Sequence, residues 1–118
     1  MISKSSKSLL GYYFDFCEKS LFLKDFFEKI YDKKKLSDDD LCMLLGIIEK
    51  GEKDLESVCF WREQILEDFK KEKVELKRKQ ILIFIQRNNA MKKEIQVCRQ
   101  ILKKLNEKWN SIEGFANE

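Results

Sequence analysis

The chain has no proline and no histidine among its 118 residues, and it has only four glycines. A β-sandwich needs turn-forming residues at the end of each strand, so this shortage argues against an all-β fold and favours unusually long helices. The absence of histidine removes the commonest general base and a frequent zinc ligand. Long helices without histidine-based chemistry are therefore the first expectation.

The motifs that usually carry chemistry are missing as well. There is no glycine-rich phosphate loop and no strand-turn-helix nucleophile motif. The acidic residues 38–40 would splay around the start of a helix, where they complement its dipole instead of binding a metal. No C-x-x-C pair is present, so we interpret the four single cysteines as core thiols: Cys17, Cys42, Cys59 and Cys98. We predict a non-enzymatic protein with no catalytic residues, no metal and no cofactor.

Long hydrophobic runs are also absent. The longest, at residues 41–48 and 81–85, are far shorter than the roughly 20 residues that span a bilayer. Near the N-terminus, Asp15 and Glu18 interrupt the apolar patch before the core of a signal peptide could form. We therefore expect a cytoplasmic protein with no membrane insertion.

A continuous heptad pattern runs from residue 81 to residue 112 and organises the chain. Apolar side chains fill its a and d positions, with one polar interruption at Asn88. Residues 8–32 and 38–71 show the same three-and-four spacing. Ser37 precedes the second of these stretches as a helix N-cap, flanked by Leu36 and Leu41 as a hydrophobic staple. The sequence therefore predicts helices at about residues 8–32, 38–71 and 75–113.

The charges of the last two segments indicate how they are connected. Residues 38–72 contain 11 acidic and 5 basic side chains, whereas residues 73–109 contain 11 basic and 3 acidic ones. Segments of opposite sign attract each other when they fold back, so we prefer a turn near residues 71–74 to one continuous helix. The predicted fold is all-α, an antiparallel three-helix coiled-coil-like bundle in a single domain spanning residues 1–118.

The two ends of the chain are expected to lie outside the helices. Residues 1–6 are polar and serine-rich, so we predict that they are disordered. Gly114 stands where a glycine would end the last helix, with Phe115 placed for the apolar contact of a Schellman cap. We therefore predict that residues 114–118 form a C-terminal tail.

Eight of the fourteen aromatic side chains fall in the first predicted helix, more than one narrow seam can bury. They either pack along the flanks of a wide core or present a surface to a partner. On the second interpretation, the partner-binding residues come from the first helix, the outward side of the last helix and a seam arginine: Phe16, Phe22, Phe26, Ile83, Val97 and Arg62. Replacing Phe22 and Phe26 with serine should then abolish partner capture and leave the thermal melt nearly unchanged.

Two stretches resemble a known family. Residues 50–69, KGEKDLESVCFWREQILEDF, and residues 86–109, QRNNAMKKEIQVCRQILKKLNEKW, are similar to the flagellar export chaperones of the FliT and FlgN kind. The likeness covers about residues 41–109. It implies a small cytosolic helical chaperone that holds the amphipathic terminal helix of an export substrate. Such a chaperone passes its substrate to a type III export machine and uses no ATP itself.

A structural subunit of a larger coiled-coil assembly is the alternative function, and formation of a homodimer stays open. Nucleic acid is not an expected partner, because the net charge of +3 is far below a strongly basic footprint. The expected partner is thus a helical segment of another protein.

Overall fold

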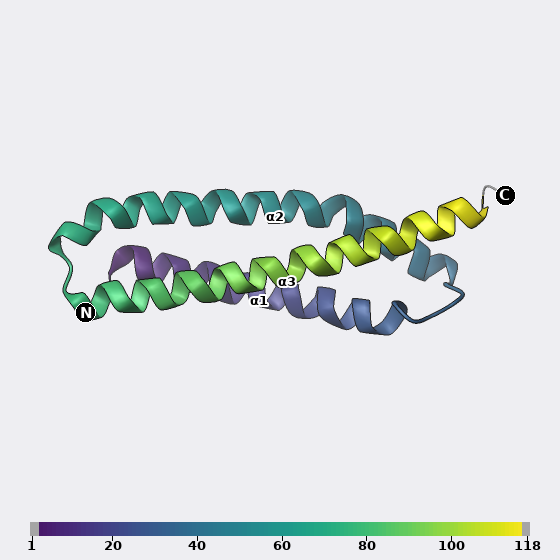
Figure 1. The fold of residues 1–118 in the computed structure, drawn as a ribbon, viewed down its shortest axis with the longest axis horizontal. Coiled ribbons are helices and arrows are strands. Elements are labelled where there is room, and N and C mark those ends of the chain that lie inside the picture. Colours follow the sequence, from purple (N-terminus) through teal and green to yellow (C-terminus); the bar gives the residue numbers. More distant parts are fainter. Residues whose placement is uncertain (1–2, 117–118) are drawn as a thin grey trace.

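The computed structural model describes residues 3–116, with side chains through residue 112. Its elements in chain order are α1 (Lys4–Ile30), α2 (Asp38–Glu72), the short 3₁₀ turn η1 (Lys73–Glu75) and α3 (Arg78–Ala116). The described residues contain no strand. In Figure 1, α2 runs opposite to α1 and α3, and the molecule is a rod of 63 × 20 × 17 Å. The predicted all-α, antiparallel three-helix bundle is confirmed.

The hairpin between α2 and α3 is held by apolar contacts. Next to the turn, the rings of Phe69 and Phe84 stack with centroids 3.7 Å apart and planes 8° apart. The chain reverses through η1 and an extended Leu76, a few residues later than the expected 71–74. Among the side chains that the structure describes, no ion pair joins α2 to α3. The fold-back was predicted from charge, but ring stacking, core packing and a hydrogen bond from Arg62 to Asn88 join the two helices.

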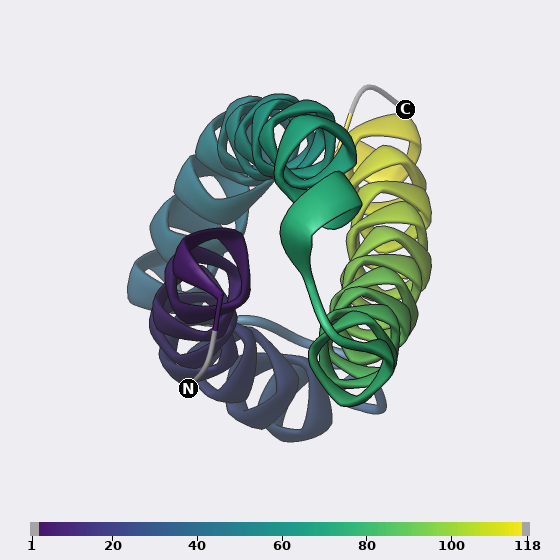
Figure 2. The same cartoon turned by 90° about the vertical axis from the view of Figure 1, so that its left-hand side faces the viewer.

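The core follows the heptad pattern of α3. Four side chains at d positions are almost fully buried: Phe84, Met91, Cys98 and Leu105. Two at central a positions, Ile95 and Leu102, are buried as well. Viewed along the rod, the three helices lie around a common long axis (Figure 2). Leu9 and Phe16 of α1, with Leu55 and Ile65 of α2, pack against these side chains of α3 from the other two sides.

The N-terminal residues are ordered, and the prediction of disorder is wrong for residues 3–6; residues 1–2 lie outside the described part. Ser3 caps α1 by accepting a hydrogen bond from the Ser6 amide at 3.0 Å. Ser6 is buried, and Arg87 of α3 donates to its hydroxyl at 2.7 Å and to its carbonyl at 3.1 Å. The serine-rich segment stays folded because tertiary partners satisfy its polar groups.

A carboxylate from α2 completes the cap of α1. Glu72 accepts hydrogen bonds from the amides of Lys4 and Ser5, at 3.0 and 3.2 Å, and from the Ser5 hydroxyl at 2.6 Å. An acid at a helix N-terminus also complements the helix dipole. The hydrogen bond from the Ser5 hydroxyl has the largest effect on the pKa of Glu72. Together with the two amides it outweighs the effect of burial and lowers the pKa of Glu72 below its ordinary value.

This cap makes stability depend on acid pH. A carboxylate whose pKa is lowered on folding adds stability above its unfolded pKa, and the contribution disappears as pH falls through the lower folded value. Glu72→Gln should therefore reduce stability near neutral pH, and the difference should shrink as pH falls through the lowered pKa of the folded carboxyl. Urea unfolding of both proteins over a series of pH values, from neutral downwards, measures this. A stability difference that does not change with pH would contradict an ionised cap.

The C-terminal prediction is also wrong for residues 114–116. α3 continues through Gly114 to Ala116, and residues 117–118 lie outside the described part. A Schellman cap places its glycine one residue past the end of the helix, whereas α3 extends two residues beyond Gly114. Gly114 therefore continues the helix and does not end it.

Two glycines of α2 differ in what surrounds them. A Cβ added at Gly51 would lie 2.7 Å from the Cδ2 atom of Leu102, whereas one added at Gly46 would meet nothing within 4 Å. Gly46→Ala should stabilise the protein by roughly 1 kcal/mol through helix propensity. Gly51→Ala should fall short of that gain, because its Cβ forces the methyl groups of Leu102 to shift, and overpacking typically costs about 1–3 kcal/mol. Chemical denaturation of the two variants tests the pair, and an equal gain in both would contradict the close approach of α2 to α3.

Candidate functional site: an apolar groove between α1 and α2

A groove of about 670 Å³ lies between α1 and α2. Its side walls are apolar side chains from both helices, including Phe16, Phe22 and Leu23 of α1 and Met43, Ile47, Leu55 and Val58 of α2. Charged side chains of both signs lie along its margins: Glu18, Lys19, Lys50 and Asp54. The groove therefore combines an apolar interior with a mixed-charge rim.

The floor of the groove is the third helix. Cys98 and Leu102 line it, although both belong to the buried seam of α3. At this level α1 and α2 therefore leave room between them down to core depth. Gly46 contributes to the opening because it carries no side chain at the wall, and a Cβ there would point into free space.

An aromatic bridge lies where the groove ends. One helical turn beyond Phe16 and Val58, Tyr12 of α1 stacks on Trp61 of α2, with ring centroids 6.1 Å apart and planes 19° apart. Phe60 meets Trp61 edge-on at 5.6 Å. These rings join α1 to α2 directly, so the groove is limited to the segment between this bridge and the α1–α2 loop.

A polar network stands beside the floor. Ser20 donates to the carboxylate of Glu94, and the Lys24 ammonium contacts the same oxygen at 2.7 Å. Burial disfavours ionisation of Glu94, but these hydrogen bonds outweigh it and lower its pKa. The Cys98 thiol lies 3.4 Å from the Ser20 hydroxyl, and burial raises the pKa of Cys98. Cys98 therefore stays a protonated thiol and behaves as a small core residue.

The structure divides the three aromatics that we expected to bind a partner. Phe22 is 57% exposed and lines the groove. Phe16 and Phe26 are only 6% and 5% exposed, so the expectation that they lie on an open surface is wrong. Phe16 forms part of the groove wall from inside the core, and Phe26 packs with Ile30 and Leu44. Because α1 packs against two helices, its buried stripe is wider than one seam.

The other three expected residues lie away from the groove. Val97 is exposed in a shallow hollow between α1 and α3, next to Phe27 and Lys104, and Ile83 is half-buried. Arg62 donates from Nη1 to the Oδ1 atom of Asn88 at 2.9 Å, so the two polar residues of the seams pair with each other. Among the described residues, the buried Nε of Arg62 has no hydrogen-bond partner. The structure does not bring Ile83, Val97 or Arg62 together with Phe22.

Met43 and Gly46 line the groove but were not predicted from the sequence. Met43 is an exposed apolar side chain in a helix, which is too common to single out. Gly46 offered a better signal, because a glycine inside a long helix is roughly 1 kcal/mol less favourable than alanine. Its place at the groove wall gives a structural reason for a residue that helix propensity disfavours.

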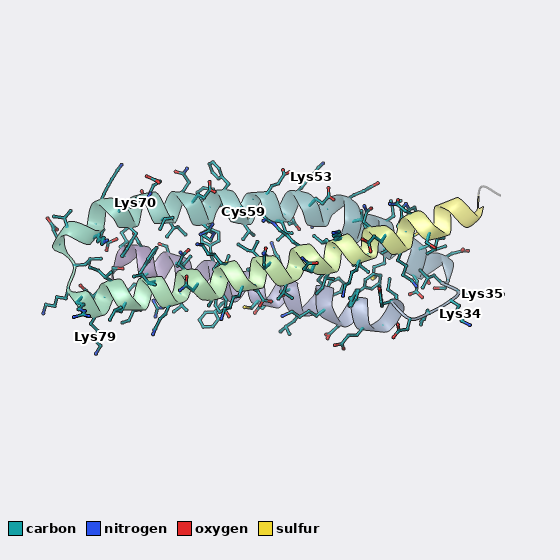
Figure 3. The ribbon with its side chains drawn as sticks, in the orientation of Figure 1. Lys34, Lys35, Lys53, Cys59, Lys70 and Lys79 are labelled. Carbon is teal, nitrogen blue, oxygen red and sulfur yellow. The ribbon has the colours of Figure 1, made fainter. Side chains whose placement is uncertain are left out.

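The exposed lysines labelled in Figure 3 are spread along the rod, with Lys34 and Lys35 at one end, Lys53 between, and Lys70 and Lys79 at the other. Four other basic side chains line a hollow of about 310 Å³ beside α2 and α3: Arg62, Lys92, Lys93 and Arg99. Within this hollow, Arg99 contacts the Cys59 sulfur at 3.2 Å. The hollow has less than half the volume of the apolar groove between α1 and α2.

Within the described part of the chain, no helix is both long enough and apolar enough to cross a bilayer. The side chains described, those of residues 3–112, also contain no group of three or more acidic or cysteine residues arranged to hold a metal ion. Comparison with known proteins finds no match to a family model, a curated protein or a solved structure.

Proposed function

We propose that this chain is a non-enzymatic chaperone or adaptor that holds one amphipathic helix of a protein partner in the α1–α2 groove. The observation that carries the proposal is the depth of the groove: its floor is the core seam of α3, and Phe22 and Met43 stand exposed at its edge. An apolar surface of this kind is typical of sites that receive an apolar face of another molecule.

The shape of the site favours a helix as the occupant. Its walls are two antiparallel helices, and a further helix laid between them would bury its apolar stripe as in a four-helix bundle. Glu18 and Lys19 on one margin, with Lys50 and Asp54 on the other, fit a partner whose apolar stripe is flanked by charges of both signs. Met43 adds an adaptable side chain that can repack around different partners.

The resemblance of residues 50–69 and 86–109 to flagellar export chaperones suggests which helix is held. In this proposal the partner is the terminal amphipathic helix of an export substrate, kept in the cytoplasm and passed to a flagellar-type type III secretion system. The chaperone contributes binding alone, and no nucleotide chemistry is required of it.

A permanent structural subunit of a coiled-coil assembly is the second candidate. The observation that favours it is a further pair of exposed apolar side chains outside the groove, Phe14 and Leu21. A chaperone releases its partner, whereas a structural subunit keeps it. Exchange of an isotopically labelled chain into the purified native complex distinguishes them, because only a releasing complex exchanges on the time scale of dissociation.

Photo-crosslinking in the native host tests the groove directly. A photoreactive amino acid at position 22 should crosslink to a protein segment that forms an amphipathic helix, identified by mass spectrometry. The same residue at position 21 is the control for crosslinks to a different protein, because Leu21 is equally exposed but does not line the groove. Crosslinks from position 21 to a second copy of this chain are told apart by mass and are not counted. Identical crosslinking from both positions, or crosslinks only to non-helical segments, would contradict the proposal.

A further inference from the structure

α1 carries a second apolar stripe, outside both the bundle core and the groove. It consists of Leu10, Phe14, Cys17 and Leu21, spaced four, three and four residues apart, so that they share one face of the helix. Phe14 is 60% exposed and Leu21 58% exposed, whereas Leu10 and Cys17 are half-buried. None of the four lines the groove. The stripe is therefore independent of the proposed partner-binding site.

We infer that this stripe is a self-association surface, on which α1 of a second copy of the chain packs antiparallel. The spacing of the four residues reads the same in both directions. A reversed copy therefore places Leu10 against Leu21 of the second copy, and Phe14 against its Cys17. A two-fold axis between Phe14 and Cys17 relates the chains, so that each contact occurs twice and the assembly closes as a dimer.

The exposed charges at the two ends of the stripe favour the antiparallel arrangement. Lys4 and Lys7 lie before it, whereas after it Asp25 and Glu28 are balanced by Lys24 and Lys29. In an antiparallel pair, the basic end of each α1 therefore meets an end of the other that carries acids and has no net charge. A parallel pair would place the two basic ends beside each other, which is unfavourable. The charges therefore favour the antiparallel orientation of a second copy.

The solution mass of the full chain tests the dimer. Sedimentation equilibrium should show the 14.2 kDa monomer at low concentration and twice that mass at high concentration. The stripe is short, so we expect a dimer dissociation constant of about 1–100 µM. This range corresponds to a free energy of association of roughly 5.5–8 kcal/mol. A wild-type protein that remains monomeric at about 1 mM would overturn the inference and leave the stripe to a different protein.

Two adjacent residues give a matched pair of variants. Leu21→Glu should abolish the dimer while the thermal melt stays cooperative, because this side chain is 58% exposed. Phe22→Glu introduces the same charge one residue away, at 57% exposure, but inside the groove, so it should leave the dimer intact. Crosslinking to the native partner should show the opposite pattern. Equal effects of both variants on the solution mass would overturn the inference.

Thiol crosslinking fixes the orientation. In a background with Cys17→Ala, Cys42→Ser and Cys59→Ser, Leu10→Cys and Leu21→Cys chains are mixed and treated with a short bis-maleimide. The antiparallel dimer predicts crosslinks between position 10 of one chain and position 21 of the other. Crosslinks of position 10 to position 10 and of position 21 to position 21 would show a parallel pair and overturn the inference.

Discussion

Replacing Phe26 with alanine should destabilise the bundle by about 3–5 kcal/mol, a large share of the total stability of a domain of this size. The ring is 5% exposed and packs against Ile30, Leu44, Ile101 and Leu105, so its removal leaves a cavity where α1 meets both other helices. The thermal midpoint should fall by more than about 10 °C.

Phe22→Ala is the matched control for that experiment. Phe22 lies one helical turn earlier in α1 and carries the same ring, but it is 57% exposed. Its replacement should change the free energy of unfolding by less than about 1 kcal/mol. Denaturant titrations of both variants supply the comparison. Similar losses at positions 22 and 26 would show that Phe22 is a core residue and that the groove is closed in solution.

Filling the groove at Gly46 should abolish capture of the native partner without harming the fold. The Cβ atom of a leucine at this position would have no neighbouring atom within 4 Å, and leucine has a higher helix propensity than glycine. Its side chain would extend into the space that a partner helix would use. Capture can be measured as the yield of partner crosslinked by a photoreactive residue at Met43. With Gly46→Leu, that yield should fall to the level seen from position 21.

Two further variants serve as controls for the Gly46→Leu experiment. Gly46→Ala adds one methyl group, keeps the groove open, and should retain capture. Phe22→Ser removes an exposed ring and should weaken capture by about 2 kcal/mol or more, roughly thirtyfold, as is usual for an aromatic anchor. A folded Gly46→Leu protein that captured its partner at the wild-type yield would show that the partner binds elsewhere.

The spacing of apolar residues predicted the helices because it reflects which side chains each helix buries. The a and d positions of α3 were identifiable from spacing alone, and Met91, Cys98 and Leu105 are indeed among the most buried side chains. The predicted N-cap at Ser37 is confirmed as well, since its hydroxyl accepts from the Asp40 amide at 3.1 Å. Signals that depend on neighbours in sequence were thus recovered.

Features that depend on distant residues were not recoverable. Nothing near Ser5 in sequence indicates that Glu72 completes its helix cap, so the polar N-terminus looked disordered. The periodicity of α1 likewise cannot show that the helix contacts both α2 and α3, which is why Phe16 and Phe26 were expected at the surface. The depth of the groove depends on how far α1 and α2 stand apart, a tertiary quantity that spacing along one helix does not contain.

The cap formed by Glu72 also makes two amide protons report on an event elsewhere in the chain. Amides in the first turn of a helix have no acceptor within the helix and normally exchange quickly with solvent. Those of Lys4 and Ser5 instead donate to a side chain that is 68 and 67 residues away. Their hydrogen exchange therefore slows only while the end of α2 is docked on the start of α1, so it follows the opening of that end of the rod without any added label.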